Sequence, residues 1–246
     1  MTWIQTAGGG RFDYLAPSVD DVYLDDVVNA LSNICRYTGH CRFYSVLQHS
    51  VNVAALLSMA GMSRETVLAG LLHDAHEAYT GDVNSPLKIA MRVAEFARQS
   101  GYTIEEIESS STAYASAMHT RSSYDLIDDR VEHVVREAFG IGSLPDSVWV
   151  DVKAADHAML KVESEACMVG GPREDWSCGE WDARMVPHLR QVMAAHVSAD
   201  AVAETFVAVY IELVRATGLR IRRENVMGAL GDALSRELLQ LALEPS

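Results

Sequence analysis

Basic residues are scarce in this 246-residue chain. It has 20 lysine and arginine residues against 34 aspartate and glutamate residues, which gives a formal net charge of −14. Binding to DNA, RNA or an anionic membrane depends on clustered cations. We therefore expect neither a nucleic-acid polymer nor a membrane among the partners. A small phosphorylated ligand is not excluded, because one pocket with a few cations or a metal ion reverses the sign locally.

Paired cysteines and long apolar runs are also missing. No Cys-x-x-Cys motif occurs among the four cysteines, which argues against a zinc knuckle and a disulfide framework. No segment approaches the ~18 consecutive apolar residues of a membrane span, and the first residues lack the basic and apolar regions of a signal peptide. We expect a cytoplasmic, unprocessed protein.

Strand-like alternation is nearly absent, and helical periodicity dominates. Residues 1–20 carry three consecutive glycines and several aromatics, which predicts an irregular or short β-hairpin-like lead-in. No internal repeat or long linker divides the chain, so we predict one all-α domain over residues 1–246. The predicted helical segments are 25–38, 46–59, 63–81, 88–100, 103–120, 124–139, 148–168, 183–196, 199–216 and 224–243.

The predicted helix 63–81 contains charged residues at positions where apolar ones are expected. Asp74 falls on the same face as Leu71, which ought to point toward the core. An unpaired buried charge is so costly that such acids are nearly always paired, protonated or bound to a metal. His73 lies on a neighbouring face, where small residues such as Gly70 would leave room for an ion and a substrate. We expect His76 on the outer face of this helix.

Two further polar residues interrupt apolar faces. His49 lies on the apolar side of segment 46–59, and Asp156 lies among apolar residues of segment 148–168, near Glu163. With the doublet His73-Asp74 they form a donor set suited to zinc, manganese, iron or cobalt rather than calcium. The alternative for each residue taken alone is a core polar side chain satisfied by hydrogen bonds. Convergence of all four on one ion is the working hypothesis.

The chain resembles the HD-domain metal-dependent phosphohydrolases, whose pattern is a His, a later His-Asp doublet and a final Asp. Three segments carry the resemblance: ALSNICRYTGHCRFYSVLQHS, LLHDAHEAYTGDVNSPLK and KAADHAMLKVESEA. They are most similar to bacterial 5′-deoxynucleotidases and to phage deoxynucleoside triphosphohydrolases acting on dATP. The resemblance covers about residues 8–90 and 150–165, with the catalytic motifs in 36–88 and 150–165. It implies a helical bundle that forms a homodimer or larger homo-oligomer, and it assigns no role to residues 165–246.

The resemblance also implies roles for single residues near the ion. The residues that match the family's metal ligands are His49, His73, Asp74 and Asp156. Glu77 matches the carboxylate that handles protons in catalysis. Since Glu77 follows His73 by four positions on the predicted helix, it would lie beside the ion without having to bind it.

Substrate contacts follow from the same resemblance. Arg36 and Tyr37 resemble the family's basic-aromatic pair near the sugar and base, although a tryptophan is frequent where this chain has Tyr37. Discrimination between deoxyribose and ribose therefore stays open. Asp82 resembles a sugar contact, with a turn that ends the helix as the alternative. Arg42 and Lys88 are further phosphate candidates, with solvated surface charge as the alternative.

The function implied is metal-dependent removal of the 5′-phosphate or the whole triphosphate from a deoxynucleotide, with adenine as a candidate base. The ion would be cobalt, manganese, zinc or iron, and the partner a small molecule. The same constellation permits hydrolysis of a cyclic or signalling nucleotide. From another class, a non-catalytic helical binding module is the alternative. Trp176 and Trp181, in a polar loop, would cover a pocket or anchor the loop on the core.

Overall fold

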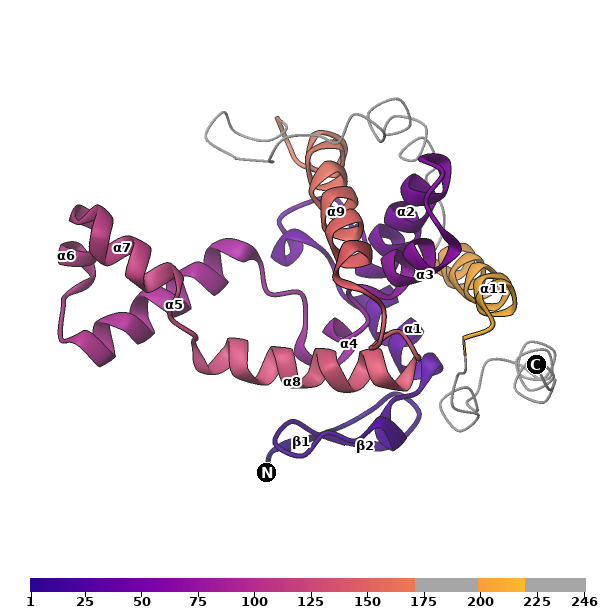
Figure 1. The fold of residues 1–246 in the computed structure, drawn as a ribbon, viewed down its shortest axis with the longest axis horizontal. Helices are drawn as coiled ribbons and strands as arrows, with labels where there is room; N and C mark the ends of the chain where they lie inside the picture. Colours follow the sequence, from indigo (N-terminus) through magenta and orange to yellow (C-terminus); the bar gives the residue numbers. More distant parts are fainter. Residues whose placement is uncertain (171–198, 220–246) are drawn as a thin grey trace.

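Helices make up most of the computed structural model, which describes residues 1–170 and 199–219 (Figure 1). The predicted helices 183–196 and 224–243, Cys178 and both loop tryptophans lie outside these ranges. The elements are β1 (Trp3–Gln5), β2 (Arg11–Asp13), η1 (Val19–Asp21), α1 (Leu24–Asn33), η2 (Tyr37–Gly39), α2 (Val46–Met59), α3 (Arg64–Leu72), α4 (Glu77–Thr80), α5 (Ser85–Ser100), α6 (Ile104–Ser109), α7 (Ser111–Met118), α8 (Ser123–Ala138), α9 (Asp146–Cys167) and α11 (Ala199–Thr217). The all-α prediction is confirmed.

The lead-in is the expected short hairpin. Strands β1 and β2 pair antiparallel, with Trp3 opposite Asp13 and Ile4 opposite Phe12. Phe12 is fully buried and stacks on Tyr79 at 4.0 Å between ring centroids. The hairpin is therefore fixed to the segment that follows the His-Asp doublet.

Across residues 1–170 and 199–219, no helix is both long and apolar enough to cross a membrane.

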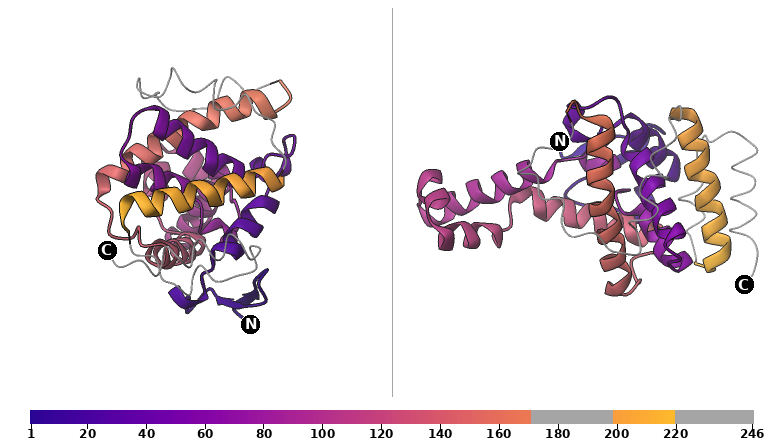
Figure 2. Two further views of the ribbon diagram at one scale, coloured as in Figure 1. Left: turned by 90° about the vertical axis from the view of Figure 1, so that its right-hand side faces the viewer. Right: turned by 90° about the horizontal axis from the view of Figure 1, so that it is seen from above.

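Helices α2, α3, α9 and α11 pack around one core, as the views in Figures 1 and 2 show. Helix α11, from the segment to which the sequence assigned no role, packs on α2 and α3. The core side chains are fully buried and come from all four helices, among them Leu47, Leu57, Leu68, Leu71, Met159 and Phe206. This core holds α2, α3 and α9 in fixed relative positions.

The α2–α3 contact corrects the prediction for Gly70. A Cβ atom at this position would lie 2.3 Å from Leu57 Cδ1 and 3.4 Å from Val53 Cγ1, both on α2. The small residue therefore allows two helices to approach closely, which is a packing role. The sequence had suggested that Gly70 leaves room for an ion and a substrate, and this expectation is wrong.

The predicted helix 63–81 is wrong in its middle. It begins where expected, because the Ser63 side chain accepts a hydrogen bond from Thr66 N at 3.2 Å. Helix α3 then ends at Leu72, residues 73–76 form a turn, and α4 covers the last four residues before Gly81, whose φ of +79° ends the segment. The break places the His-Asp doublet on a turn at the end of α3.

Helices α5, α6 and α7 form an arm that projects from the body of the molecule (Figures 1 and 2). The predicted single helix 103–120 is wrong: it divides at Ser110, whose side chain caps α7 by accepting from Ala113 N at 3.3 Å. The arm has a small apolar cluster of its own, built on Val93, Ile107 and Ala117. Its base is tied to α8 by Arg92 and Asp125.

Candidate metal centre

The four predicted ligands come from three elements that the core holds together. His49 lies in α2 and is fully buried, His73 and Asp74 lie on the turn after α3, and Asp156 lies in α9. The side chains of His73, Asp74 and Asp156 are 9%, 15% and 19% exposed. The site is thus almost closed to solvent but reachable from one side.

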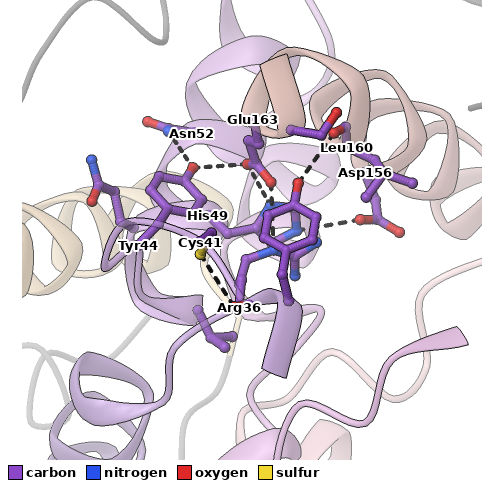
Figure 3. Close-up of polar contacts among 12 residues, drawn as sticks. Arg36, Cys41, Tyr44, His49, Asn52, Asp156, Leu160 and Glu163 are labelled. Atoms are coloured by element: carbon purple, nitrogen blue, oxygen red, sulfur yellow. Dashed lines mark hydrogen bonds and ion pairs between the residues drawn. The ribbon is translucent and has the colours of Figure 1, made fainter. Parts of the chain in front are cut away.

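Three of these residues present donor atoms to one another. His49 Nε2 lies 3.3 Å from His73 Nε2 and 3.5 Å from Asp74 Oδ2, and His73 Nε2 lies 3.1 Å from Asp74 Oδ2. Among the residues that the structure describes, they form a mutually close group able to hold a metal ion. Asp156 Oδ1 adds a contact of 3.3 Å to His49 Nε2 (Figure 3).

These separations fit a transition-metal ion. Bonds of about 2.1 Å from a single ion place neighbouring donor atoms about 3.0–3.4 Å apart in octahedral or tetrahedral geometry. The measured separations run from 3.1 to 3.5 Å. Two imidazole nitrogens with two carboxylates also match the borderline softness of zinc, manganese, iron and cobalt. The donor set and its spacing therefore suit the ions expected from the sequence.

The far nitrogen of each imidazole is held by a hydrogen bond. His73 Nδ1 lies 2.8 Å from the carbonyl oxygen of Gly70, and His49 Nδ1 lies 2.7 Å from Glu163 Oε1. Such contacts fix the ring and its tautomer. Each imidazole therefore turns its Nε2 toward the other and toward Asp74.

Glu163 was missed as a site residue. It is fully buried in α9, and its second oxygen lies 3.4 Å from Arg36 Nε. The signal was available, because Glu163 follows Asp156 by seven positions and so shares its helix face. The same rule that selected Asp156, an acid at an apolar position, also selects Glu163.

The pKa values of Asp74, Asp156 and His49 are shifted in the direction that favours the charged form of each side chain. Burial raises the pKa of Asp74 and of Asp156, but nearby imidazoles outweigh it and hold each pKa below its ordinary value. Burial and Arg36 lower the pKa of His49, but Glu163 and Asp156 outweigh them and raise it to about 9. The carboxylates therefore stay ionised, as ligands of a cation must, whereas His49 would lose a proton when it binds one.

Glu77 has the opposite environment. Burial, with the charges of Asp74 and Asp82, raises the pKa of Glu77 well above its ordinary value. Its Oε2 atom is buried and makes no hydrogen bond within the described part of the chain. The side chain faces the same cavity as the donor cluster. Its surroundings therefore favour the protonated form of this carboxyl group, which lies beside the site.

A cavity of about 1460 Å³ opens on the donor cluster. The predicted substrate contacts that line it are Arg36, Tyr37, Asp82 and Lys88. Burial, followed by the charge of Asp74, raises the pKa of Asp82 although Arg36 opposes this shift. Lys88 is not a solvated surface charge, since its Nζ lies 3.3 Å from Asp128 Oδ2.

Arg42 and His76 lie elsewhere than expected. Arg42 does not line the cavity; its Nη2 donates to the carbonyl oxygen of Ala166 at 3.1 Å, beside a smaller hollow of about 530 Å³. His76 is 8% exposed and lines the cavity, with Nε2 3.7 Å from Asp128 Oδ1. The expected outer position of His76 is wrong because the helix is interrupted before it.

A tight loop brings Arg36 to the donors. Tyr37 and Thr38 have φ values of 57° and 55°, in the left-handed region that non-glycine residues rarely adopt. Two hydrogen bonds hold them there, Tyr37 Oη to the carbonyl oxygen of Leu160 at 3.1 Å and Asn84 Nδ2 to Thr38 Oγ1 at 2.7 Å. The loop places Arg36 Nη1 3.6 Å from Asp74 Oδ2.

The chain is similar to known proteins over the segment that carries this cluster. The family model described as "HD domain" matches residues 46–157, which include all four predicted metal ligands. The uncharacterized protein YfdR of Escherichia coli is 31% identical over 164 residues, which cover 66% of this chain and 71% of YfdR. An uncharacterized protein of Rhodobacter capsulatus is 28% identical over 169 residues, again 66% of this chain and 71% of the relative.

Proposed function

The chain belongs to the HD-domain family, whose members are metal-dependent phosphohydrolases, and from this premise we propose that it removes the 5′-phosphate of a deoxynucleotide. The observation that carries the proposal is the placement of the donor cluster. His49, His73 and Asp74 converge, and the last two line a cavity that also presents the guanidinium of Arg36 and the carboxyl group of Glu77. These are the groups that hydrolysis of a phosphate ester needs.

The residues that would hold the ion are His49, His73, Asp74 and Asp156. When bound there, a divalent ion supplies a water of lowered pKa and neutralises charge on a phosphate oxygen. Cobalt, manganese, zinc and iron all remain candidates for this ion.

Arg36 would bind and orient the phosphate group. Its guanidinium lies at the donor cluster, 3.6 Å from Asp74 Oδ2, and its planar set of donors matches two phosphate oxygens. The Arg36 side chain is 11% exposed, so the contact forms where water is largely excluded. Tyr37 and Asp82 on the same cavity wall would contact the base and the sugar.

Glu77 would supply the proton that the leaving group needs. Cleavage of the bond between phosphorus and the 5′ oxygen leaves an alkoxide, which a carboxylic acid can protonate. The pKa of Glu77 is raised well above its ordinary value, which favours the protonated form, and its buried Oε2 has no hydrogen-bond partner within residues 1–170 and 199–219. The products are a deoxynucleoside and inorganic phosphate.

Charge pairing in the cavity favours a substrate with one phosphate. Within residues 1–170 and 199–219, each lysine and arginine lining the cavity has a carboxylate partner. The pairs are Arg36 with Asp74, Lys88 with Asp128, Arg136 with Glu132, and Lys153 with Asp156. A triphosphate would need further cations for its β and γ groups. We therefore place the monophosphate ahead of the triphosphate.

A substrate panel tests the proposal. Purified protein with added Mn²⁺, Co²⁺ or Zn²⁺ is incubated with dAMP, AMP, dATP and a cyclic nucleotide, and orthophosphate and tripolyphosphate are separated and quantified. We expect orthophosphate from dAMP. Tripolyphosphate from dATP would instead favour the triphosphohydrolase, and opening of the cyclic nucleotide would favour the phosphodiesterase. Absence of release from every nucleotide would overturn the hydrolase assignment.

A further inference from the structure

Glu163 lies behind the donor cluster and has no part in the steps proposed above. It is in α9, and its side chain is 0% exposed. Burying an ionised side chain is costly unless several partners compensate for lost hydration. The partners of Glu163 therefore indicate what the residue does.

One oxygen of Glu163 is bound by two donors. Glu163 Oε1 accepts from Tyr44 Oη at 2.8 Å and lies 2.7 Å from His49 Nδ1 (Figure 3). Asn52 Nδ2 in turn donates to Tyr44 Oη at 2.7 Å. Because a carboxylate only accepts hydrogen bonds, His49 must carry a proton on Nδ1. His49 Nε2, the atom facing His73 and Asp74, is thereby left as the metal-binding nitrogen.

The second oxygen of Glu163 faces the proposed phosphate-binding residue. Glu163 Oε2 lies 3.4 Å from Arg36 Nε as an ion pair without a hydrogen bond. The same guanidinium reaches Asp74 Oδ2 through Nη1 at 3.6 Å. Arg36 is thus held between a carboxylate behind the site and a carboxylate within it.

We propose that Glu163 is a positioning residue that fixes His49 and Arg36 together, so that one buried carboxylate sets both metal affinity and phosphate binding. The part that concerns Arg36 rests on the proposed function, whereas the part that concerns His49 does not. Loss of a hydrogen bond to the second ring nitrogen of a metal-binding histidine typically lowers metal affinity 10- to 100-fold. Glu163 differs from such a contact in acting on a second, substrate-facing residue as well.

The test is Glu163→Gln, which keeps the shape of the side chain and removes its charge. The metal-free protein is titrated with Mn²⁺, and KM and kcat for dAMP are then measured at saturating Mn²⁺. We expect Mn²⁺ affinity to fall about 10- to 100-fold and KM to rise by more than kcat falls. The matched control is Tyr44→Phe, which removes a neighbouring hydrogen bond to the same carboxylate but no contact to His49 or Arg36. We expect Mn²⁺ affinity and KM of this control within about twofold of wild type.

A measurement on the wild-type protein covers the case in which Glu163→Gln fails to fold. With ¹⁵N-labelled histidine and bound Zn²⁺, we expect the His49 ring to show an exchange-protected proton on Nδ1 and none on Nε2. A proton on Nε2, or wild-type Mn²⁺ affinity in Glu163→Gln, would overturn the proposal for His49. An unchanged KM would overturn it for Arg36. Reduced Mn²⁺ affinity in a protein that hydrolyses no nucleotide would support the role at His49 while the proposed function fails.

Discussion

At the scale of single residues, two carboxyl groups three positions apart have opposite properties. Asp74 contacts the imidazole of His73, which holds its pKa below the ordinary value, whereas Glu77 is buried near other acids, which raises its pKa. The surroundings thus favour the ionised form of Asp74 and the protonated form of Glu77.

The contrast predicts different losses on substitution. Glu77→Gln should lower kcat by about 10²–10⁴-fold with Mn²⁺ affinity unchanged, because only the proton donor is lost. Asp74→Asn should lower both kcat and Mn²⁺ affinity, because a proposed metal ligand is lost. Steady-state rates with dAMP and Mn²⁺ titration of each metal-free variant separate the two. A Glu77→Gln variant with wild-type rates would remove the role assigned to Glu77.

Gly70 gives a stability prediction. In Gly70→Ala the new methyl group would meet Leu57 Cδ1 at 2.3 Å inside the α2–α3 contact, so we expect a loss of about 1–3 kcal/mol in the free energy of unfolding. Urea titration measures this loss. The control is Gly142→Ala, which meets the tip of the exposed, flexible Glu137 side chain at 2.0 Å. A loss in the control as large as in Gly70→Ala would contradict the packing explanation.

Residue-level prediction succeeded where a polar side chain interrupts an apolar face. His49 and Asp156 were found in this way, and the structure brings His49 to the His-Asp doublet and Asp156 to His49. The same rule reaches Glu163 but says nothing of its partners, because they come from distant segments. The position of Arg36 depends on a left-handed loop backbone, which no helical periodicity reveals.

At the scale of elements, the joint between the arm and the body depends on a buried carboxylate. Asp125 in α8 accepts from Arg92 Nη2 in α5 at 2.7 Å and from Ser122 N at 2.8 Å. Its side chain is 6% exposed. Hydrogen bonds to Arg92 and Ser122 hold the pKa of Asp125 below its ordinary value of 3.8, although burial opposes this shift. The joint is therefore strongest when Asp125 is ionised.

This predicts a pH-dependent effect of Asp125→Asn. At pH 7 the variant should lose about 2 kcal/mol in free energy of unfolding, since a charge-assisted pair and a capping contact weaken. Because the folded-state pKa is depressed, the contribution of Asp125 is present above about pH 4 and decreases below it. The difference between wild type and variant should therefore narrow in acid.

Urea titrations at pH 7 and at pH 3 measure that difference. Asp129→Asn is the control, since its pair with Arg121 is exposed and should contribute less than about 0.5 kcal/mol. A difference for Asp125→Asn that widens toward pH 3 would contradict the assignment.

Element prediction was best where capping signals and apolar period agree. Ser63 caps α3 where the helix was expected to begin, and the bounds of α2 are confirmed. It failed at residues 73–76 and at Ser110, where the helical pattern continues through a break. At Ser110 the side chain starts a new helix by accepting a hydrogen bond from Ala113 N.

At the scale of the whole molecule, the donor cluster joins segments that are far apart in the chain. Helix α2, the turn after α3, and α9 each contribute, and carboxylate oxygens of Asp74 and Asp156 lie 3.5 Å and 3.3 Å from His49 Nε2. An ion bound only by the folded state stabilises that state by mass action. Metal binding and the stability of the folded state are therefore linked.

We accordingly expect Mn²⁺ to raise the free energy of unfolding by about 2.7 kcal/mol at a concentration 100 times its dissociation constant. A chelator should reverse the effect. Thermal unfolding with Mn²⁺ and with chelator measures it, and His73→Ala serves as the control that should not respond. Equal responses of wild type and control would show that the ion binds elsewhere.

The architecture as a whole was predictable, because composition and periodicity both favour helices. One domain over residues 1–246 and assembly into a homodimer or larger oligomer stay predictions. Periodicity identifies which face of a helix is buried but not what covers it, so it could not place α11 on α2 and α3. The shape of the arm likewise depends on local breaks in the helical pattern.

The order of the donors along the chain also affects biosynthesis. The ribosome releases a protein from its N-terminus, so His49 and the His-Asp doublet emerge well before α9. Until α9 emerges, Glu163 is absent, so the nascent chain has neither the hydrogen-bond partner of His49 nor one of the two carboxylates beside Arg36. A product terminated ahead of α9 would retain the family's most recognisable doublet and still be unable to complete the centre.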